Sequence, residues 1–369
     1  SEMCIRDSYS IGFEAIKGEI RGIRLNLKTY EKIAAYDIIN GIRICRAVSG
    51  SRFNPVKGHL SLATHLGGQT VEVLLSSPRG FCAGVVRAID VVDICLRRYG
   101  PPVYVKHQIV HNPYVVNDLE RRGAITVEEV EEIPEGSLVV FSAHGSPPED
   151  FEKAKARNLQ VIDAVCPLVT RVHNEAKKYH NEGKKVILVG HRGHQEVRGT
   201  MGQVEMTLID DTSEKDLPDW EIDEEVAVLT QTTLSVGDTA RAINSIRDKF
   251  PEAVIRNDIC YATTNRQDAV TEMANSVDLV LVIGAENSSN CNRLREVAEA
   301  LGVESYLING PEEIDPSWLD GKNKVGITSG ASTPEVLVEA VIDKLAPETV
   351  TMVSGVEEDI TFNLPQQLR

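Results

Sequence analysis

The sequence lacks a long apolar run. None of its 369 residues lie in a stretch of about 18 consecutive apolar residues, so no segment offers a membrane-spanning helix. The N-terminus also lacks a charged segment followed by an apolar stretch and a small-residue cleavage site, and we expect no secretory signal there. A hydrophobic content of 42% with 25% charged residues is typical of soluble globular proteins. The length predicts two or three α/β units of roughly 100 residues each.

The sequence has fewer positively charged residues than negatively charged ones. The chain has 39 Lys and Arg residues against 55 Asp and Glu residues, which gives a formal net charge of −16. Nucleic acids and anionic membranes bind to concentrated basic surfaces, so we expect neither as a partner. An anionic small molecule would need a locally favourable pocket.

Cysteines are few and widely scattered. The seven positions are Cys4, Cys45, Cys82, Cys95, Cys166, Cys260 and Cys291. Their odd number and wide spacing argue against a secreted disulfide scaffold and favour reduced thiols in a cytoplasm. The close CxxC pairs that are usual in structural zinc sites are also absent.

A repeated pattern begins at residue 71. A short β-branched run leads into a polar or glycine-containing loop and then into an amphipathic helix, which is typical of βα units. The expected strands are residues 71–75, 137–141, 185–189, 226–229, 279–283 and 324–327. We predict an α/β fold of three similar units around a central site. The predicted divisions are an N-terminal extension of unknown role at 1–70, units at 71–165, 166–259 and 260–346, and a tail at 347–369 with a possible edge strand at 360–362.

Three cysteines recur about once per unit. Cys82 follows the first strand of its unit, whereas Cys166 and Cys260 lie at unit junctions. Parallel sheets bind ligands beyond the carboxyl ends of their strands, and three thiolates converging there would suit an iron–sulfur cluster with one iron free of protein sulfur. Ordinary buried cysteines and a shared zinc ion are the alternatives. We expect Cys95 and Cys291 to be structural.

Polar residues fill the six loops after the expected strands. Imidazole, hydroxyl and amide groups near helix N-termini can bind phosphate oxygens, although each alone also suits a helix cap. The candidates are His111, His144, His194, Thr232, Ser288, Ser289, Asn290 and Ser332. Glu196, close to His194, is a candidate acid, with a solvated loop glutamate as the alternative. Walker and dinucleotide motifs are absent, which disfavours nucleotide binding.

Long segments of the chain resemble one enzyme family. They are PRGFCAGVVRAI (78–89), HQIVHNPYVV (107–116), FSAHG (141–145), DAVCPLVTRVH (163–173), GTMGQ (199–203), TQTTLSV (230–236), DICYATTNRQ (258–267), NSSNCNRL (287–294), GITSGASTPE (326–335) and EEDITFNLPQQLR (357–369). Together they resemble the 4-hydroxy-3-methylbut-2-enyl diphosphate reductases, which act last in the methylerythritol phosphate route to isoprenoids. The resemblance spans residues 71–369.

The resemblance implies a role for each candidate residue. It implies one [4Fe–4S] cluster on Cys82, Cys166 and Cys260, and a three-lobed α/β fold. The implied diphosphate ligands are His111, His144, His194, Ser288, Ser289, Asn290 and Ser332. Thr232 and Glu196 would handle the substrate hydroxyl and deliver a proton.

The implied reaction removes the allylic hydroxyl as water with two electrons and two protons, giving isopentenyl and dimethylallyl diphosphates. No flavin or pyridine-nucleotide motif is evident, and the resemblance implies a ferredoxin or flavodoxin as electron donor. Two alternatives from other classes are a cluster-bearing redox sensor that binds an anionic effector and a zinc-stabilised binding domain. A sensor would bind the diphosphate without consuming it, and a zinc protein would be colourless.

Overall fold

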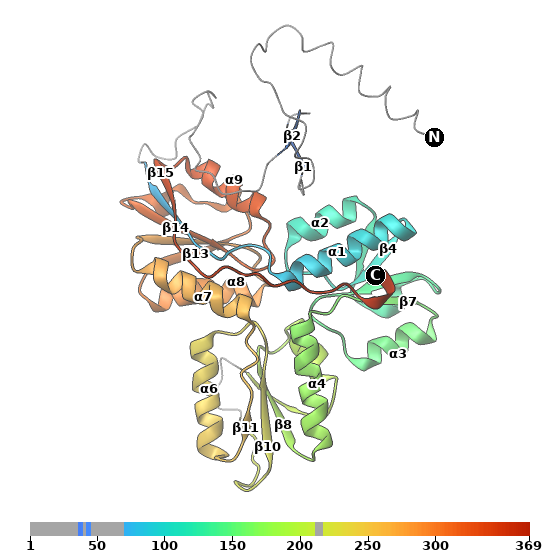
Figure 1. The fold of residues 1–369 in the computed structure, drawn as a ribbon. Helices are drawn as coiled ribbons and strands as arrows, with labels where there is room; N and C mark the ends of the chain where they lie inside the picture. The colour runs from blue at the N-terminus through green and yellow to red at the C-terminus, as the bar shows by residue number, and fades with distance from the viewer. Residues whose placement is uncertain (1–35, 40–41, 46–69, 211–216) are drawn as a thin grey trace, which may run out of the picture. The chain divides into compact units, whose positions relative to one another are not determined.

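The computed structural model describes residues 36–39, 42–45, 70–210 and 217–369 (Figure 1). The chain divides into two compact units at residues 62 and 63. The described part of the first unit is an antiparallel hairpin of β1 (Tyr36–Ile39) and β2 (Ile42–Cys45). The rest of the predicted extension, including Cys4, lies outside the described residues except for Thr70. Among the described helices, none has the length and apolar character needed to span a membrane.

The first sheet of the second unit is built from residues 103–163. Its parallel strands are β4 (Val103–Lys106), β5 (Ala124–Val127), β6 (Leu138–Phe141) and β7 (Gln160–Asp163), in the order β5-β4-β6-β7. Helices α1 (Ala83–Tyr99), α2 (Pro113–Arg121) and α3 (Pro148–Ala156) accompany them. On β6, Val140 packs in the core with α1, whereas Val139 and Phe141 pack in the core with α3. Burial on both faces explains the continuous apolar run of this strand.

The second sheet has the same architecture. Its parallel strands are β8 (Lys185–Gly190), β9 (Thr207–Asp210), β10 (Val226–Thr230) and β11 (Val254–Ile255), in the order β11-β10-β8-β9. Helices α4 (Pro167–Asn181) and α5 (Gln195–Met201) pack on one face, and α6 (Val236–Lys249) packs on the other.

The third sheet draws on both ends of the unit. Its parallel strands are β3 (Glu72–Leu75), β12 (Leu279–Ile283), β13 (Glu304–Ile308), β14 (Lys324–Ser329) and β15 (Thr349–Met352), in the order β13-β12-β14-β3-β15. Helices α7 (Tyr261–Ala274) and α8 (Ser289–Ala300) cover one face, and α9 (Glu335–Leu345) covers the other. Short 3₁₀ helices lie at η2 (Val130–Glu132), η3 (Pro311–Glu313), η4 (Pro316–Leu319) and η5 (Gln366–Leu368).

The α/β architecture and the six expected strands are confirmed, with ends shifted by one or two residues. The grouping of the first strand differs, however. The predicted first unit joins residues 71–75 to the strand at 137–141, whereas β3 pairs with β14 and β15 of the third sheet. Its Val73 and Leu75 pack in that core, while the following helix α1 packs against β4. The other predicted boundaries, which divide the units after residues 165, 259 and 346, stay a prediction.

The predicted edge strand at 360–362 is wrong. These residues form an extended segment without strand pairing, and the edge of the third sheet is β15. β15 completes the sheet by pairing in register with β3. Figure 1 shows the segment after β15 running from the third sheet to the C-terminus beside β7.

Candidate active site

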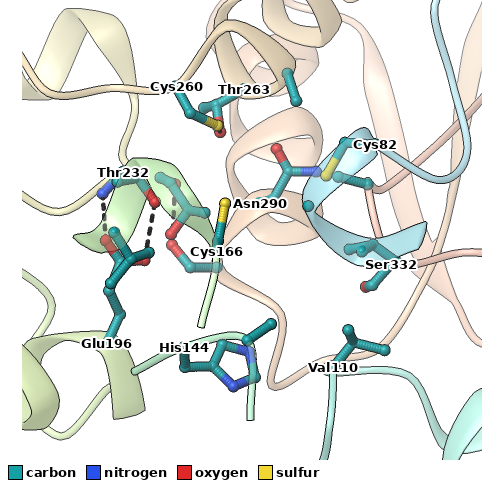
Figure 2. A pocket seen from close by; sticks show the side chains of 18 of the residues that line it. Cys82, Val110, His144, Cys166, Glu196, Thr232, Cys260, Thr263, Asn290 and Ser332 are labelled. Atoms are coloured by element: carbon teal, nitrogen blue, oxygen red, sulfur yellow. Dashed lines mark hydrogen bonds between the residues drawn. The ribbon is translucent and has the colours of Figure 1, made fainter. Parts of the chain in front are cut away.

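One pocket lies where loops of all three sheets meet (Figure 2). Its empty space is about 720 Å³ including the part open to solvent, within the usual size range of small-molecule sites. Every residue that the sequence singled out for chemistry lines it: Cys82, His111, His144, Cys166, His194, Glu196, Thr232, Cys260, Ser288, Ser289, Asn290 and Ser332. The geometry therefore brings the whole predicted set together.

The three pocket cysteines occupy equivalent backbone positions. Cys82, Cys166 and Cys260 are the N-cap residues of α1, α4 and α7. The N-terminus of a helix carries partial positive charge, which stabilises a thiolate or another anion placed there. Three such helix ends converging on one pocket favour a negatively charged group at its centre.

Backbone hydrogen bonds connect each cysteine to a second pocket loop. The amide of Cys82 donates to the carbonyl of Ala331 at 3.2 Å, beside Ser332. The amide of Cys166 donates to Ala143 at 2.9 Å, beside His144, and that of Cys260 donates to Thr232 at 3.0 Å. Each cysteine is thus fixed to a loop that carries a predicted substrate or proton-transfer residue.

The space between the sulfur atoms depends on a small residue. A Cβ at Gly84 would lie 2.8 Å from Sγ of Cys166 and 3.8 Å from Sγ of Cys82, so any larger residue would crowd these thiols. Within the described residues, no three Cys, His, Asp or Glu side chains are close enough together to bind a single metal ion.

Burial keeps the thiols of Cys166 and Cys260 protonated until a cation binds. It raises the pKa of Cys166 to about 12 and that of Cys260 to about 11. Iron would supply the positive charge that converts such thiols to thiolate ligands.

Three histidine rings gather on one side of the pocket. The rings of His111 and His144 stack with centroids 4.0 Å apart, and His194 lies 5.3 Å from His111. Burial lowers the pKa of His111 to about 4 and that of His194 to about 3, and it lowers the pKa of His144 well below the usual range. All three are therefore neutral donors before a ligand arrives.

The hydrogen bond to His194 identifies its free nitrogen. Nδ1 of His194 accepts from the backbone N–H of Glu196 at 3.2 Å. A neutral imidazole with an accepting Nδ1 carries its proton on Nε2. Nε2 is thus the nitrogen left to donate to a bound oxygen.

Other pocket groups have unused hydrogen-bonding capacity. Nε2 of His111 and both side-chain polar atoms of Asn290 are buried without a partner. Oγ of Ser288 accepts from the amide of Cys291 at the start of α8. Unpaired buried polar groups are costly, so these atoms favour a polar ligand.

Two of the predicted hydroxyl groups already donate hydrogen bonds to backbone carbonyls. Oγ of Ser289 donates to the carbonyl of Thr233 at 3.0 Å, and Oγ of Ser332 donates to the carbonyl of His111 at 2.9 Å. A ligand that used these protons would have to replace those two bonds.

Glu196 is deeply buried instead of solvated, with 3% of its surface exposed, on the first turn of α5. Thr232 donates its backbone N–H to Oε1 of Glu196 and its hydroxyl to Oε2 (Figure 2). Burial raises the pKa of Glu196 to about 7, although both bonds from Thr232 act against this rise. The site therefore contains a carboxyl group that holds a proton near neutral pH.

Among the lining residues that the sequence reasoning missed, Thr263 lies closest to the proposed chemistry. Thr263 is 1% exposed, lines the pocket and places its Oγ1 3.2 Å from Sγ of Cys260. Its position three residues after Cys260 was the available signal, since residues three apart share a helix face. By contrast, Cys95 and Cys291 are fully buried in apolar cores and do not line the pocket, in agreement with a structural role.

The fold and site define a class: an α/β protein with a pocket bounded by three helix-capping cysteines, three neutral histidines and a protonated carboxyl. Residues 73–346 match the family model described as LytB protein. The chain belongs to the LytB family.

Named relatives agree with this assignment. The chain is 50% identical over 318 residues to 4-hydroxy-3-methylbut-2-enyl diphosphate reductase 2 of Burkholderia mallei, covering 84% of this chain and 97% of the relative. It is similar to the solved E-1-hydroxy-2-methyl-but-2-enyl-4-diphosphate reductase of Plasmodium falciparum, with 36% identity, a TM-score of 0.77, and 81% and 96% of the two chains covered. A second solved reductase, described as the terminal enzyme of the non-mevalonate pathway, is 35% identical with a TM-score of 0.55 and 75% and 99% covered.

Proposed function

We propose that this chain converts (E)-4-hydroxy-3-methylbut-2-enyl diphosphate to isopentenyl and dimethylallyl diphosphates, the last step of the methylerythritol phosphate pathway. Family membership and the identity to named reductases support this activity. The single observation that carries the assignment to particular residues is the pocket itself, which contains every predicted group.

One [4Fe–4S] cluster is held by Cys82, Cys166 and Cys260. The family is one of iron–sulfur enzymes, and three converging thiols with the Gly84 space between them support this ligand set. When bound, such a cluster supplies the two electrons and, at the iron without a cysteine ligand, a Lewis acid for the hydroxyl group. All other steps fall to the protein side chains.

The substrate diphosphate is bound mainly by neutral donors. His111, His144 and His194 form one wall, and Ser288, Ser289, Asn290 and Ser332 bring further donors from the third sheet. A diphosphate anion close to these rings would raise their pKa values, because a nearby negative charge favours the charged imidazolium. Binding would then draw in protons and strengthen the hydrogen bonds to the phosphate oxygens.

Glu196 is the proton source for loss of the hydroxyl. Its carboxyl proton passes to Thr232 Oγ1, and the Thr232 hydroxyl proton passes to the departing oxygen, which leaves as water. Protonation matters because hydroxide is a poor leaving group. The short contacts between Glu196 and Thr232 and the raised pKa of Glu196 support this route.

The two electrons come from a small external carrier, a ferredoxin or flavodoxin. We place the reaction in the cytoplasm, because no disulfide joins any of Cys82, Cys95, Cys166, Cys260 and Cys291.

Substrate turnover tests the proposed function. The protein is purified without oxygen, its iron and sulfide are measured, and the diphosphate substrate is added with a chemical reductant. The proposal expects a brown protein that forms both five-carbon diphosphates. A cluster-bearing protein that binds the substrate and leaves it unchanged would instead be a sensor, and the proposal would be wrong.

A further inference from the structure

The last 17 residues, 353–369, form an extended segment that we call the C-terminal strap. Val353 packs against the core of the third sheet, whereas Leu364 and Leu368 pack in the core around α1 and β4. The strap is thus anchored at both ends in different sheets, and Figure 1 shows it crossing between them. Between the two anchors it meets a pair of buried arginines.

Arg266 joins the strap to two cysteine-bearing elements. It lies on α7, the helix that Cys260 caps, and none of its surface is exposed. Its guanidinium donates to the carbonyl of Gly80 at 2.8 Å and to both carboxylate oxygens of Glu358 in the strap, at 2.9 and 3.3 Å. Gly80 precedes Cys82 by two residues and has φ of +70°, a left-handed conformation that favours glycine. One guanidinium therefore connects the Cys260 helix, the Cys82 loop and the strap.

Arg87 makes the corresponding connection to the third cysteine. It lies on α1, the helix that Cys82 caps, and is 9% exposed. Its Nε donates to the strap carbonyl of Asn363 at 2.8 Å, and its Nη1 donates to the carbonyls of Ala164 and Val165 at 3.0 and 2.9 Å. Those two residues come directly before Cys166.

The two arginines thus connect all three cysteine loops through hydrogen bonds. Arg266 connects the Cys260 helix to the Cys82 loop, and Arg87 connects the Cys82 helix to the Cys166 loop. The loops come from separate sheets, so their spacing depends on contacts between sheets. A cluster needs a fixed separation of its ligands, and the residues behind metal ligands set that geometry.

We infer that Arg87 and Arg266 are positioning residues that, with Glu358 of the C-terminal strap, hold the three cysteine loops at the separation a cluster requires. The inference rests on the proposed function. Neither arginine lines the pocket, so neither contacts the substrate. Their planar forks spread donors over three nitrogens and bind several acceptors at once, and lysine, whose donors share one nitrogen, cannot reproduce this.

The test compares Arg87→Lys, Arg266→Lys and Glu358→Gln with wild type and with Arg98→Lys as a matched control. Arg98 also donates to strap carbonyls, those of Gln367 and Leu368, but it connects to no cysteine loop. Each protein is reconstituted without oxygen, and the rate of iron release to a chelator and the cluster reduction potential are measured. Thermal unfolding shows whether each variant is folded.

Both arginine variants should release iron about 10–100-fold faster than wild type, the range seen for residues behind metal ligands, and should shift the reduction potential. Glu358→Gln should also release iron faster and should shift the reduction potential in the same direction. If Arg266→Lys does not fold, Glu358→Gln tests the inference in its place. Arg98→Lys should match wild type. Wild-type release rates in the arginine and Glu358 variants would overturn the inference, as would equally fast release from Arg98→Lys. Wild-type protein that takes up no cluster would instead refute the proposed function.

Discussion

Thr232 holds the carboxylate of Glu196 by both oxygens, donating its backbone N–H to Oε1 at 2.7 Å and its hydroxyl to Oε2 at 2.9 Å. The two residues come from different strand ends of the second sheet, and both are at least nine-tenths buried. This contact fixes the carboxyl in one orientation, and burial keeps its proton up to a pH of about 7. A positioned and protonated acid is what cleavage of a carbon–hydroxyl bond requires.

Glu196→Gln should abolish proton delivery while leaving the pocket intact. Glutamine has a similar size and still bonds to Thr232, but it has no carboxyl proton to transfer. We expect turnover to fall about 10²–10⁴-fold, the usual contribution of a general acid. Iron content and substrate affinity should match wild type, which separates a chemical defect from misfolding. Near-normal turnover at saturating reductant would show that the proton has another source.

The rate of hydroxyl loss should depend on the protonation of Glu196. Its pKa is raised to about 7, so the protonated, active form dominates below that pH and is lost as the pH rises through it. Above pH 7 the single-turnover rate should fall about tenfold per pH unit, because the fraction of protonated acid falls by that factor. Rapid-quench measurements from about pH 5.5 to about 9 would measure how the single-turnover rate depends on pH. A profile that is flat in wild type, or that is unchanged in Glu196→Gln, would contradict the assignment.

Diphosphate binding should take up protons. Burial lowers the pKa values of His111, His144 and His194, and a bound anion raises them again. Affinity for inorganic diphosphate should therefore increase as the pH falls from 8 to about 6. Calorimetry in buffers of different ionisation enthalpy measures the proton uptake directly. Binding without proton uptake would mean that the ligand lies away from these rings.

Asn290→Asp should weaken diphosphate binding without affecting the cluster. The two side chains have nearly the same shape, but aspartate replaces an unpartnered donor by a negative charge at a position that is 4% exposed. Like charges repel strongly where water is excluded, so substrate affinity should fall by at least about tenfold. Asn275, the exposed residue that caps the C-terminus of α7 away from the pocket, provides the control variant Asn275→Asp. Equal affinities in the two variants would place the diphosphate elsewhere.

Much of the site could be predicted because its signals are local. Short β-branched runs followed by glycine-containing or polar loops marked the ends of the strands, and parallel sheets bring such loops together. Cys82, Cys166 and Cys260 could be found for this reason, since each begins a helix in a comparable loop.

The remaining features depend on long-range pairing. Nothing near Glu196 in the sequence reveals that Thr232, 36 residues away, satisfies both of its oxygens. The partners of β3 lie at the opposite end of the chain, so its sheet could not be read from residues 71–75. Likewise, Arg266 looks like an ordinary helix residue until Gly80 and Glu358 are brought to it.

Serine at any pocket cysteine should cause loss of the cluster. Serine keeps the side-chain size but removes the thiolate that iron prefers. Cys82→Ser, Cys166→Ser and Cys260→Ser should each lose most of their iron and their activity. Cys95→Ala, which changes a fully buried thiol on the core-facing side of α1, is the control and should remain brown. Loss of the chromophore in Cys95→Ala alone would overturn the ligand assignment.

The central claim is that the cluster and the diphosphate site share one pocket, with one iron facing the substrate. Mössbauer spectroscopy of protein reconstituted with ⁵⁷Fe, recorded before and after substrate is added, tests it most directly. Three cysteine ligands on a four-iron cluster leave one iron in a different environment, so one subset of the signal should stand apart and change when the substrate binds. Four equivalent irons, or a spectrum that the substrate leaves unchanged, would contradict the account.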